Sequence, residues 1–199
     1  MSVFAVVPVK DLIGTKSRLS PVVDPAGRAG LTLYMMCRVV GALREAGVAG
    51  VGVVSPDPIV LDFARERDAV PILQRSRGLN SALDEGRAWA MERGADALLV
   101  LPADLPLLVA ADVRAVIEEA GTRPGVTISP DANRSGTNAL LLRPPDAIPF
   151  LFGVGSFEAH CEAVRDRGIE LRVWESQHLG FDLDTTGDLE HFPKKEQDS

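Results

Sequence analysis

The sequence has few cysteines and no long apolar run. Its only two cysteines, Cys37 and Cys161, are far apart and in no C-x-x-C pattern. This excludes a disulfide framework, and we expect both to be reduced, structural thiols. No apolar run reaches the roughly 20 residues that span a bilayer, and the N-terminus lacks a signal-peptide pattern. We therefore expect a cytoplasmic protein without a membrane partner.

Several enzyme motifs are also missing. The chain has no G-x-x-x-x-G-K-[ST] phosphate loop, no G-x-G-x-x-G fingerprint and no G-x-S-x-G nucleophile elbow. Covalent catalysis by serine or cysteine is therefore disfavoured, and the three histidines show no zinc spacing. The net charge of −7 argues against nucleic acid as a partner. A small anionic substrate is compatible with this charge, because a few local cations and a metal can dominate a pocket.

The chain does contain short apolar runs that alternate with segments of helical spacing. This alternation predicts an α/β domain over residues 1–193, with a mainly parallel central sheet and helices on both faces. Residues 194–199 are expected to be a polar tail. The expected strands are 3–9, 48–55, 69–73, 97–101, 126–129, 139–142 and 170–174.

A carboxylate follows the fourth of these strands. Five apolar residues, 97–101, precede Pro102, which ends strand pairing, and Asp104 comes next but one. Open α/β sheets bind ligands at the carboxyl ends of their strands. Asp104 is therefore either a ligand of Mg²⁺ held against a phosphate, or part of a strand-end turn or helix cap.

A basic loop follows the first strand. Residues 10–21 include Gly14 and three cations, Lys10, Lys16 and Arg18. Backbone N–H groups and cations in this position are typical of a loop that cradles the phosphates of a nucleotide. The alternative is an ordinary solvated basic loop.

A glycine opens the helix expected after residue 78. Asn80 or Ser81 would cap this helix. A nucleotide base or phosphate could also approach the backbone closely at Gly78, because glycine has no side chain.

Two further segments could line a site. Residues 134–138, Arg-Ser-Gly-Thr-Asn, precede a buried strand and would either face a ligand or form a turn. Residues 152–157 place two glycines and Ser156 at a helix N-terminus. That arrangement suits a carboxylate or phosphate, and it equally suits a glycine-rich turn with a serine cap.

A second acidic group lies near the C-terminus. Asp182 and Asp184 would face the same way on a strand, because side chains alternate along it. Two like charges held together need a counter-ion, and Mg²⁺ would supply it. Asp184 would also cap the short helix expected after Thr185.

Together and in order, six segments resemble the 2-phospho-L-lactate/phosphoenolpyruvate guanylyltransferase (CofC/FbiD) family. They are VPVKDLIGTKSRLSP, GLNSAL, LPADLPLL, SGTNALLL, FGVGSF and GFDLDTTGDL. The resemblance covers nearly all of residues 3–192 and implies a single-domain, Rossmann-like nucleotidyltransferase fold. It also implies transfer of GMP from GTP to a small phosphorylated three-carbon acid, release of pyrophosphate, and a place in coenzyme F-420 biosynthesis.

The resemblance further implies a role for each site residue. The residues implied to bind the nucleotide are Lys10, Lys16, Arg18, Gly78 and Asn80. Those implied to bind the acid are Thr137, Gly153 and Ser156. The implied Mg²⁺ ligands are Asp104, Asp182 and Asp184, and the implied catalytic residues are Lys16, Arg18 and Asp104. Many relatives have proline where this chain has Val154, which leaves the choice of acid open.

Other functions compete with this interpretation. One is a related nucleotidyltransferase that uses another nucleotide or a sugar-phosphate acceptor. Another is a GTP-binding regulatory module without turnover, although such a module would be free to lose the acidic positions and the basic loop. The sequence does not decide among 2-phospho-L-lactate, phosphoenolpyruvate and 3-phospho-D-glycerate. A homodimer is the assembly expected for an intracellular protein.

Overall fold

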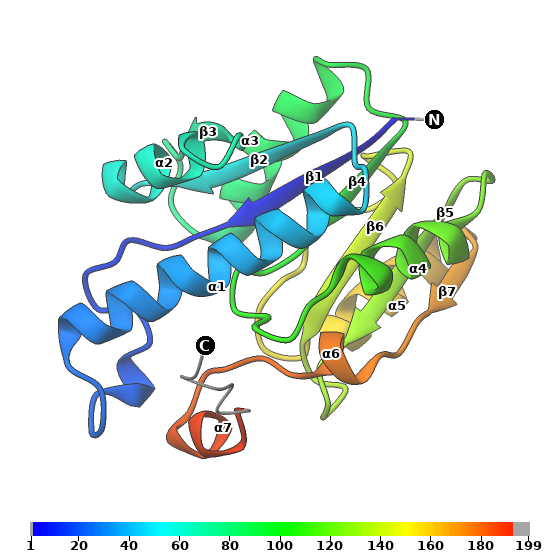
Figure 1. The fold of residues 1–199 in the computed structure, drawn as a ribbon. Helices are drawn as coiled ribbons and strands as arrows, with labels where there is room; N and C mark the ends of the chain where they lie inside the picture. Colours follow the sequence, from blue (N-terminus) through cyan, green and yellow to red (C-terminus); the bar gives the residue numbers. More distant parts are fainter. Residues whose placement is uncertain (1, 193–199) are drawn as a thin grey trace.

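The computed structural model describes residues 2–192, which form a seven-stranded sheet flanked by helices (Figure 1). The predicted tail, 194–199, and the domain boundary at 193 lie outside the described residues. The strands are β1 (Val3–Pro8), β2 (Gly50–Ser55), β3 (Val70–Leu73), β4 (Ala97–Val100), β5 (Gly125–Pro130), β6 (Thr137–Arg143) and β7 (Leu171–Val173).

The strand order is β3-β2-β1-β4-β6-β5-β7. Strand β6 runs antiparallel to β4 and β5, whereas the other neighbouring strands are parallel. The predicted mainly parallel sheet is thus confirmed, and its seven strands lie within three residues of the ends predicted for them. Adjacent parallel strands β1 and β4 bring their carboxyl ends, and the loops that follow, to the same edge of the sheet.

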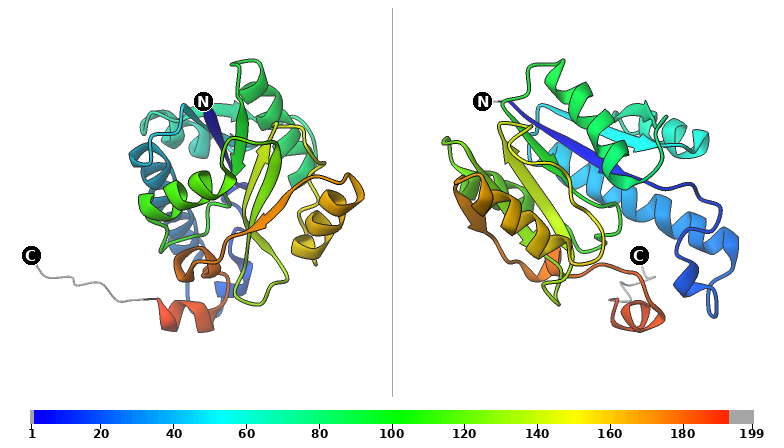
Figure 2. Two further views of the ribbon diagram at one scale, coloured as in Figure 1. Left: turned by 90° about the vertical axis from the view of Figure 1, so that its right-hand side faces the viewer. Right: turned by 180° about the vertical axis from the view of Figure 1, so that it is seen from behind.

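Helices cover both faces of the sheet, as predicted. They are α1 (Pro25–Glu45), α2 (Pro58–Arg65), α3 (Leu79–Met91), α4 (Ala110–Ala120), α5 (Ser156–Asp166), α6 (Gln177–Gly180) and α7 (Thr186–His191), with a 3-10 turn, η1, at Ser17–Leu19. In Figure 1, α1 and α4 lie in front of the sheet; α3 and α5 lie in front when the molecule is seen from behind (Figure 2, right). Within the described part of the chain, no helix is long and apolar enough to cross a membrane.

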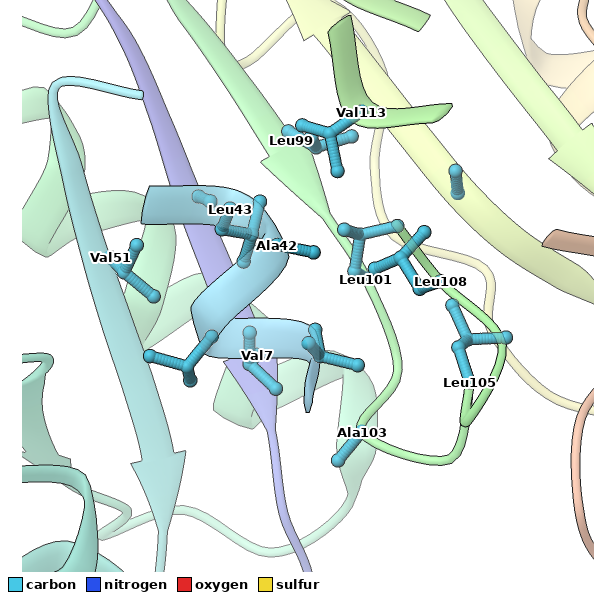
Figure 3. Close-up of a cluster of buried hydrophobic side chains, with 14 of the residues drawn as sticks. Val7, Ala42, Leu43, Val51, Leu99, Leu101, Ala103, Leu105, Leu108 and Val113 are labelled. Atoms are coloured by element: carbon cyan, nitrogen blue, oxygen red, sulfur yellow. The ribbon is translucent and has the colours of Figure 1, made fainter. Parts of the chain in front are cut away.

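Alternation along the strands divides the core into two layers. Ala5 and Val7 of β1 belong to the cluster beneath α1, α2 and α4, whereas Phe4 and Val6 belong to the cluster beneath α3 and α5. Figure 3 shows part of the first layer, where Leu43 of α1 and Leu99 of β4 are among the labelled side chains. Both predicted thiols are free, with Cys37 in α1 and Cys161 in α5.

A third, smaller cluster joins the two ends of the chain. Leu19, Met35 and Leu183 are buried together, and Phe181 packs against them. This cluster holds the segment that carries Asp182 and Asp184 against the basic loop. Apolar packing therefore fixes the distance between the cations of that loop and the C-terminal carboxylates.

Side chains cap the N-termini of α1 and α7. Asp24 caps α1 by accepting a hydrogen bond from the Gly27 N–H at 2.6 Å, with proline at the first helical position. The cap expected from Asp184 is wrong. Thr185 is the N-cap of α7, and its hydroxyl accepts from the Asp188 N–H.

Candidate active site

Lys16 lies between two of the predicted carboxylates. Its Nζ is 2.8 Å from Oδ2 of Asp104 and 2.8 Å from Oδ1 of Asp184. Asp104 follows β4, Lys16 follows β1, and Asp184 is brought in by the C-terminal segment. The structure therefore brings together three predicted site residues that are far apart in the sequence.

The surroundings of Lys16 keep its ammonium charged. Burial by itself would lower the pKa of Lys16, but the charges and hydrogen bonds of Asp104 and Asp184 outweigh it and raise the pKa. The residue also has a left-handed backbone, with φ of 48°, which costs a non-glycine residue about 1 kcal/mol. This conformation is held in place by two ion pairs with an almost fully buried ammonium.

Asp182 adds a third carboxylate to this group. The pKa of Asp182 is raised by burial and by the charges of Asp104 and Asp184, while a hydrogen bond from Asn138 opposes the rise. The segment 181–184 is not a strand, so that expectation is wrong. Instead, the Leu183 N–H donates a hydrogen bond to the Asp104 carbonyl at 3.1 Å, and this contact places the segment beside the loop after β4.

The three carboxylates fit a divalent cation by their chemistry. Carboxylate oxygens are the ligands Mg²⁺ prefers, and burial together with the charges of Asp104 and Asp184 raises the pKa of Asp182. Among residues 2–192, however, no three side chains of His, Cys, Asp or Glu are already arranged around a common metal position. Lys16 stands between two of the carboxylates, and the Mg²⁺ assignment stays a prediction.

The other cations of the basic loop are more exposed. Arg18 approaches Asp184, with Nη1 3.4 Å from Oδ2, and its side chain is 73% exposed. Lys10 is exposed at the start of the loop, and Gly14 has φ of 81°. An exposed ion pair of this kind contributes little to stability, so breaking it to bind a phosphate would cost Arg18 little. Phosphate binding by Arg18 and Lys10 stays a prediction.

Neither Asn80 nor Ser81 caps α3, so the predicted cap is wrong. The N-cap is Gly78, with φ of 93° and no side-chain cap. The Asn80 amide instead donates to the Phe152 carbonyl at 3.1 Å and accepts from the Phe152 N–H at 2.9 Å. Asn80 therefore ties the start of α3 to the loop that carries Gly153, which links the predicted nucleotide-binding and acid-binding residues.

The loop before α5 depends on glycine. Gly153 has φ of 142° and Gly155 has φ of 72°, and Val154 between them is fully exposed. Any other residue would be strained in these conformations. Gly155, not Ser156, is the N-cap of α5, so the alternative of a serine cap is wrong.

The predicted acid-binding hydroxyls meet a buried histidine. The Ser156 hydroxyl donates to Oγ1 of Thr137 at 3.1 Å, and Oγ1 of Thr137 is also 3.1 Å from Nδ1 of His160. Nε2 of His160 accepts the Leu151 N–H at 3.0 Å. Burial lowers the pKa of His160 to about 4, and the Ser156 carbonyl partly offsets this, so the ring is neutral near pH 7.

Sequence reasoning missed His160 and Asn138. The four-residue spacing of Ser156 and His160 was a usable signal, because it places both side chains on one face of a helix. Asn138 lies within β6, where its amide donates to the Leu179 carbonyl at 2.8 Å. Of the segment 134–138, Thr137 and Asn138 belong to β6, whereas Ser135 and Gly136 form a turn on Asp131. Thr137 contacts Ser156, and Asn138 contacts the C-terminal segment at Leu179.

Solved structures of nucleotidyltransferases share this fold. A Desulfovibrio desulfuricans protein assigned as a nucleotide-diphospho-sugar transferase aligns over 100% of this chain and 90% of its own, with a TM-score of 0.77 and 18% identity. A nucleotidyl transferase from Methanothermobacter aligns over 96% and 95%, with a TM-score of 0.67 and 17% identity. These similarities show that the chain has the α/β fold of these nucleotidyltransferase structures.

Sequence comparison narrows this class. The model of the family described as guanylyl transferase CofC like matches residues 3–193, and the chain belongs to this family. The phosphoenolpyruvate guanylyltransferase of Rubrobacter xylanophilus is 61% identical over 189 residues, 95% of this chain and 92% of the relative. The 2-phospho-L-lactate guanylyltransferase of Methanothermobacter thermautotrophicus is 37% identical over 191 residues, 95% of this chain and 83% of the relative. The family resemblance inferred from six motifs is confirmed.

Proposed function

We propose that this enzyme transfers GMP from GTP to a small phosphorylated three-carbon acid and releases pyrophosphate. The observation that carries the proposal is Lys16, a charged and nearly buried ammonium between Asp104 and Asp184, beside a third carboxylate. Such a site can receive a triphosphate together with a divalent cation. The names of the relatives support guanylyl transfer, with phosphoenolpyruvate favoured by the 61% identical one and 2-phospho-L-lactate by the 37% identical one.

The reaction does not require a strong general base from the protein. A phosphate oxygen of the acid attacks the α-phosphorus of GTP, a new P–O bond forms, and the bond to the β-phosphate oxygen breaks as pyrophosphate leaves. The nucleophile is already ionised, so alignment and charge stabilisation supply the catalysis.

The residues divide this work by position. Lys16, Arg18 and Lys10 bind the triphosphate, and Lys16 is held charged before substrate arrives. Asp104, Asp182 and Asp184 would hold Mg²⁺, which supplies charge neutralisation when bound. Thr137, Gly153 and Ser156 orient the acid, while Gly78 faces the nucleoside and Asn80 fixes the loop between them.

A product that feeds assembly of coenzyme F-420 rests on the family resemblance alone. The cytoplasmic location is proposed from the sequence pattern, and the homodimer from the assembly that is usual for intracellular proteins. The third acid, 3-phospho-D-glycerate, is kept as a candidate acceptor.

The experiment is pyrophosphate release with GTP and Mg²⁺, run separately with each of the three acids and repeated with ATP, CTP and UTP. Release that requires GTP and one acid would support guanylyl transfer and identify the acceptor. Release with another nucleotide would favour a related nucleotidyltransferase. Binding of GTP without release with any acid would contradict the proposal and favour a regulatory module.

A further inference from the structure

His160 connects all three residues that are predicted to bind the acid. It lies on α5 one turn after Ser156, and its Nδ1 is 3.1 Å from the Thr137 hydroxyl at the start of β6. Its Nε2 accepts the Leu151 N–H in the loop that carries Gly153. The Phe152 ring packs edge-on against the imidazole, with 4.9 Å between ring centroids. One side chain therefore touches β6, α5 and the glycine-containing loop.

The contacts of His160 fix which ring nitrogen carries the proton. A backbone N–H can only donate, so Nε2, which accepts from Leu151, is unprotonated. The neutral imidazole then carries its hydrogen on Nδ1, where it is shared between Oγ1 of Thr137 and the Ser156 carbonyl. The fully buried position of the ring keeps water from supplying another partner.

This tautomer in turn determines the direction of the Thr137 hydroxyl. Oγ1 of Thr137 accepts from His160 Nδ1–H and from the Ser156 hydroxyl, so both of its acceptor positions are filled. Its own hydrogen is then left to point away from the ring and the serine. The ionised phosphate and carboxylate groups of a phosphorylated acid offer only acceptor oxygens, so a hydroxyl that must donate matches these groups.

We propose that His160 is a positioning residue that makes Thr137 an obligatory hydrogen-bond donor to the acid substrate and holds the Leu151–Gly155 loop in its binding conformation. The inference rests on the proposed function, because it concerns the acid site of that reaction. It assigns His160 no contact with the acid or with the reacting phosphorus. Its effect is therefore expected in the affinity for the acid and not in the binding of GTP.

Substitutions at His160 separate the two hydrogen bonds. In His160→Asn the amide nitrogen takes the place of Nδ1 and can still donate to Thr137. In His160→Gln the amide reaches the Nε2 position and the donor at Nδ1 is lost, and His160→Leu removes both groups. We expect the KM for the acid to rise roughly 10- to 100-fold in the Gln and Leu variants, the range for a lost hydrogen bond to a charged group. The Asn variant should recover most of this loss, and the KM for GTP should change less than about twofold.

A matched control shows whether loosening of the helix alone explains the result. Val164 is a fully buried residue of α5 outside the network, and Val164→Ala should destabilise the protein while leaving the KM for the acid unchanged. If Asn, Gln and Leu at position 160 raise the KM equally, or if Val164→Ala raises it as much, the positioning role is contradicted.

A double-mutant cycle tests the coupling between His160 and Thr137 directly, because it compares the effect of one substitution with and without the other. Thr137→Val removes the hydroxyl and keeps the shape of the side chain. We expect Thr137→Val alone to raise the KM for the acid, and His160→Gln to add less than about twofold on that background. Full additivity of the two effects would show that His160 does not act through Thr137.

The tautomer provides a readout that does not depend on turnover. Nitrogen NMR, with His160→Asn to assign the signals, should show a protonated Nδ1 and an unprotonated Nε2 at pH 7 in the substrate-free protein. The opposite tautomer would overturn the inference even if guanylyl transfer is confirmed. If the wild-type protein releases no pyrophosphate with any acid, the proposed function fails first and the inference fails with it.

Discussion

The ammonium of Lys16 and the carboxylate of Asp104 are 2.8 Å apart, although 88 positions separate them in the chain. The same ammonium is 2.8 Å from Asp184. The protein therefore keeps a cation inside a group of carboxylates before any substrate binds. This arrangement lowers the repulsion among the acids and leaves charges of both signs ready for a triphosphate and a metal ion.

Replacing Asp104 by asparagine is expected to reduce turnover at least about 100-fold while leaving the fold intact. The amide keeps the size of the side chain but removes its charge. A rate loss of this size is typical when a preorganised electrostatic contact is removed. The measurement is the rate of pyrophosphate release, with circular dichroism as the check on folding. Asp62→Asn makes the same chemical change on the exposed surface of α2 and should turn over normally. Near wild-type activity in Asp104→Asn would eliminate this residue as a metal ligand.

Lys16→Met should make the protein depend on Mg²⁺ for stability. Three carboxylates are then left without their internal cation, which should lower the free energy of unfolding by about 1–3 kcal/mol, between the values for exposed and buried pairs. Thermal denaturation should show that Mg²⁺ raises Tm more in this variant than in the wild type. Arg18→Met is the control, because its pair with Asp184 is longer and more exposed, and it should shift Tm little. Equal Mg²⁺ responses in all three proteins would argue against a metal at these carboxylates.

Asn80→Ala distinguishes an indirect role from a direct one. The substitution removes both hydrogen bonds to Phe152, so the free energy of unfolding should fall by about 1–2 kcal/mol. If Asn80 acts by holding the loop, the KM for the acid should rise more than the KM for GTP. If it contacts the guanine, discrimination between GTP and ATP should fall instead. Ser81→Ala, the neighbouring change in α3, should affect neither KM.

The low pKa of His160 predicts a loss of stability in mild acid. The pKa is about 4 in the folded protein against 6.5 for the unperturbed side chain, so the unfolded chain takes up a proton first as the pH falls. The neutral ring of His160 makes its full contribution to the free energy of unfolding above about pH 6.5. This contribution decreases as the pH falls from about 6.5 to about 4. Linkage gives a loss of about 2 kcal/mol between pH 7 and pH 5.

The pH effect can be isolated by comparison with His160→Asn, which does not titrate in this range. Urea unfolding at pH 7 and pH 5 should show a larger drop in the wild type than in the variant. Identical drops in the two proteins would mean that His160 is not neutral and buried in solution. The carboxyls with lowered pKa, including Glu85 and Asp188, also stabilise the folded protein, but they lose this effect only at a lower pH than His160 does.

Much of the fold could be predicted because its signals are local. Buried parallel strands appear as continuous apolar runs, and residues 97–101 are such a run that becomes β4. Asp24 followed by Pro25 marks the start of α1 because both requirements of a helix N-terminus are met by adjacent residues. The position of Asp104 followed from the end of that strand.

The remaining features depend on contacts between distant segments. Asn80 looked like a cap because capping involves near neighbours, but its partner, Phe152, is 72 residues away. A position beside Mg²⁺ or a phosphate could be inferred for Asp184 and Lys16 separately, whereas their mutual ion pair depends on the sheet order and on the small cluster around Leu183. The spacing of His160 from Ser156 shows that the two share a helix face, but it does not show that Thr137 of β6 lies against that face.

The separation of Lys16 and Asp184, 168 positions, also has a consequence during protein synthesis. At the 5–20 residues per second of translation, roughly 10 to 30 s pass between the appearance of the lysine and that of its second carboxylate partner. Throughout this interval the nascent chain contains Lys16 and, later, Asp104, but it still lacks the segment that carries Asp184. A ribosome-bound chain that has folded its sheet still cannot form the complete group of charges, which is assembled only when the segment with Asp184 has been translated and has docked.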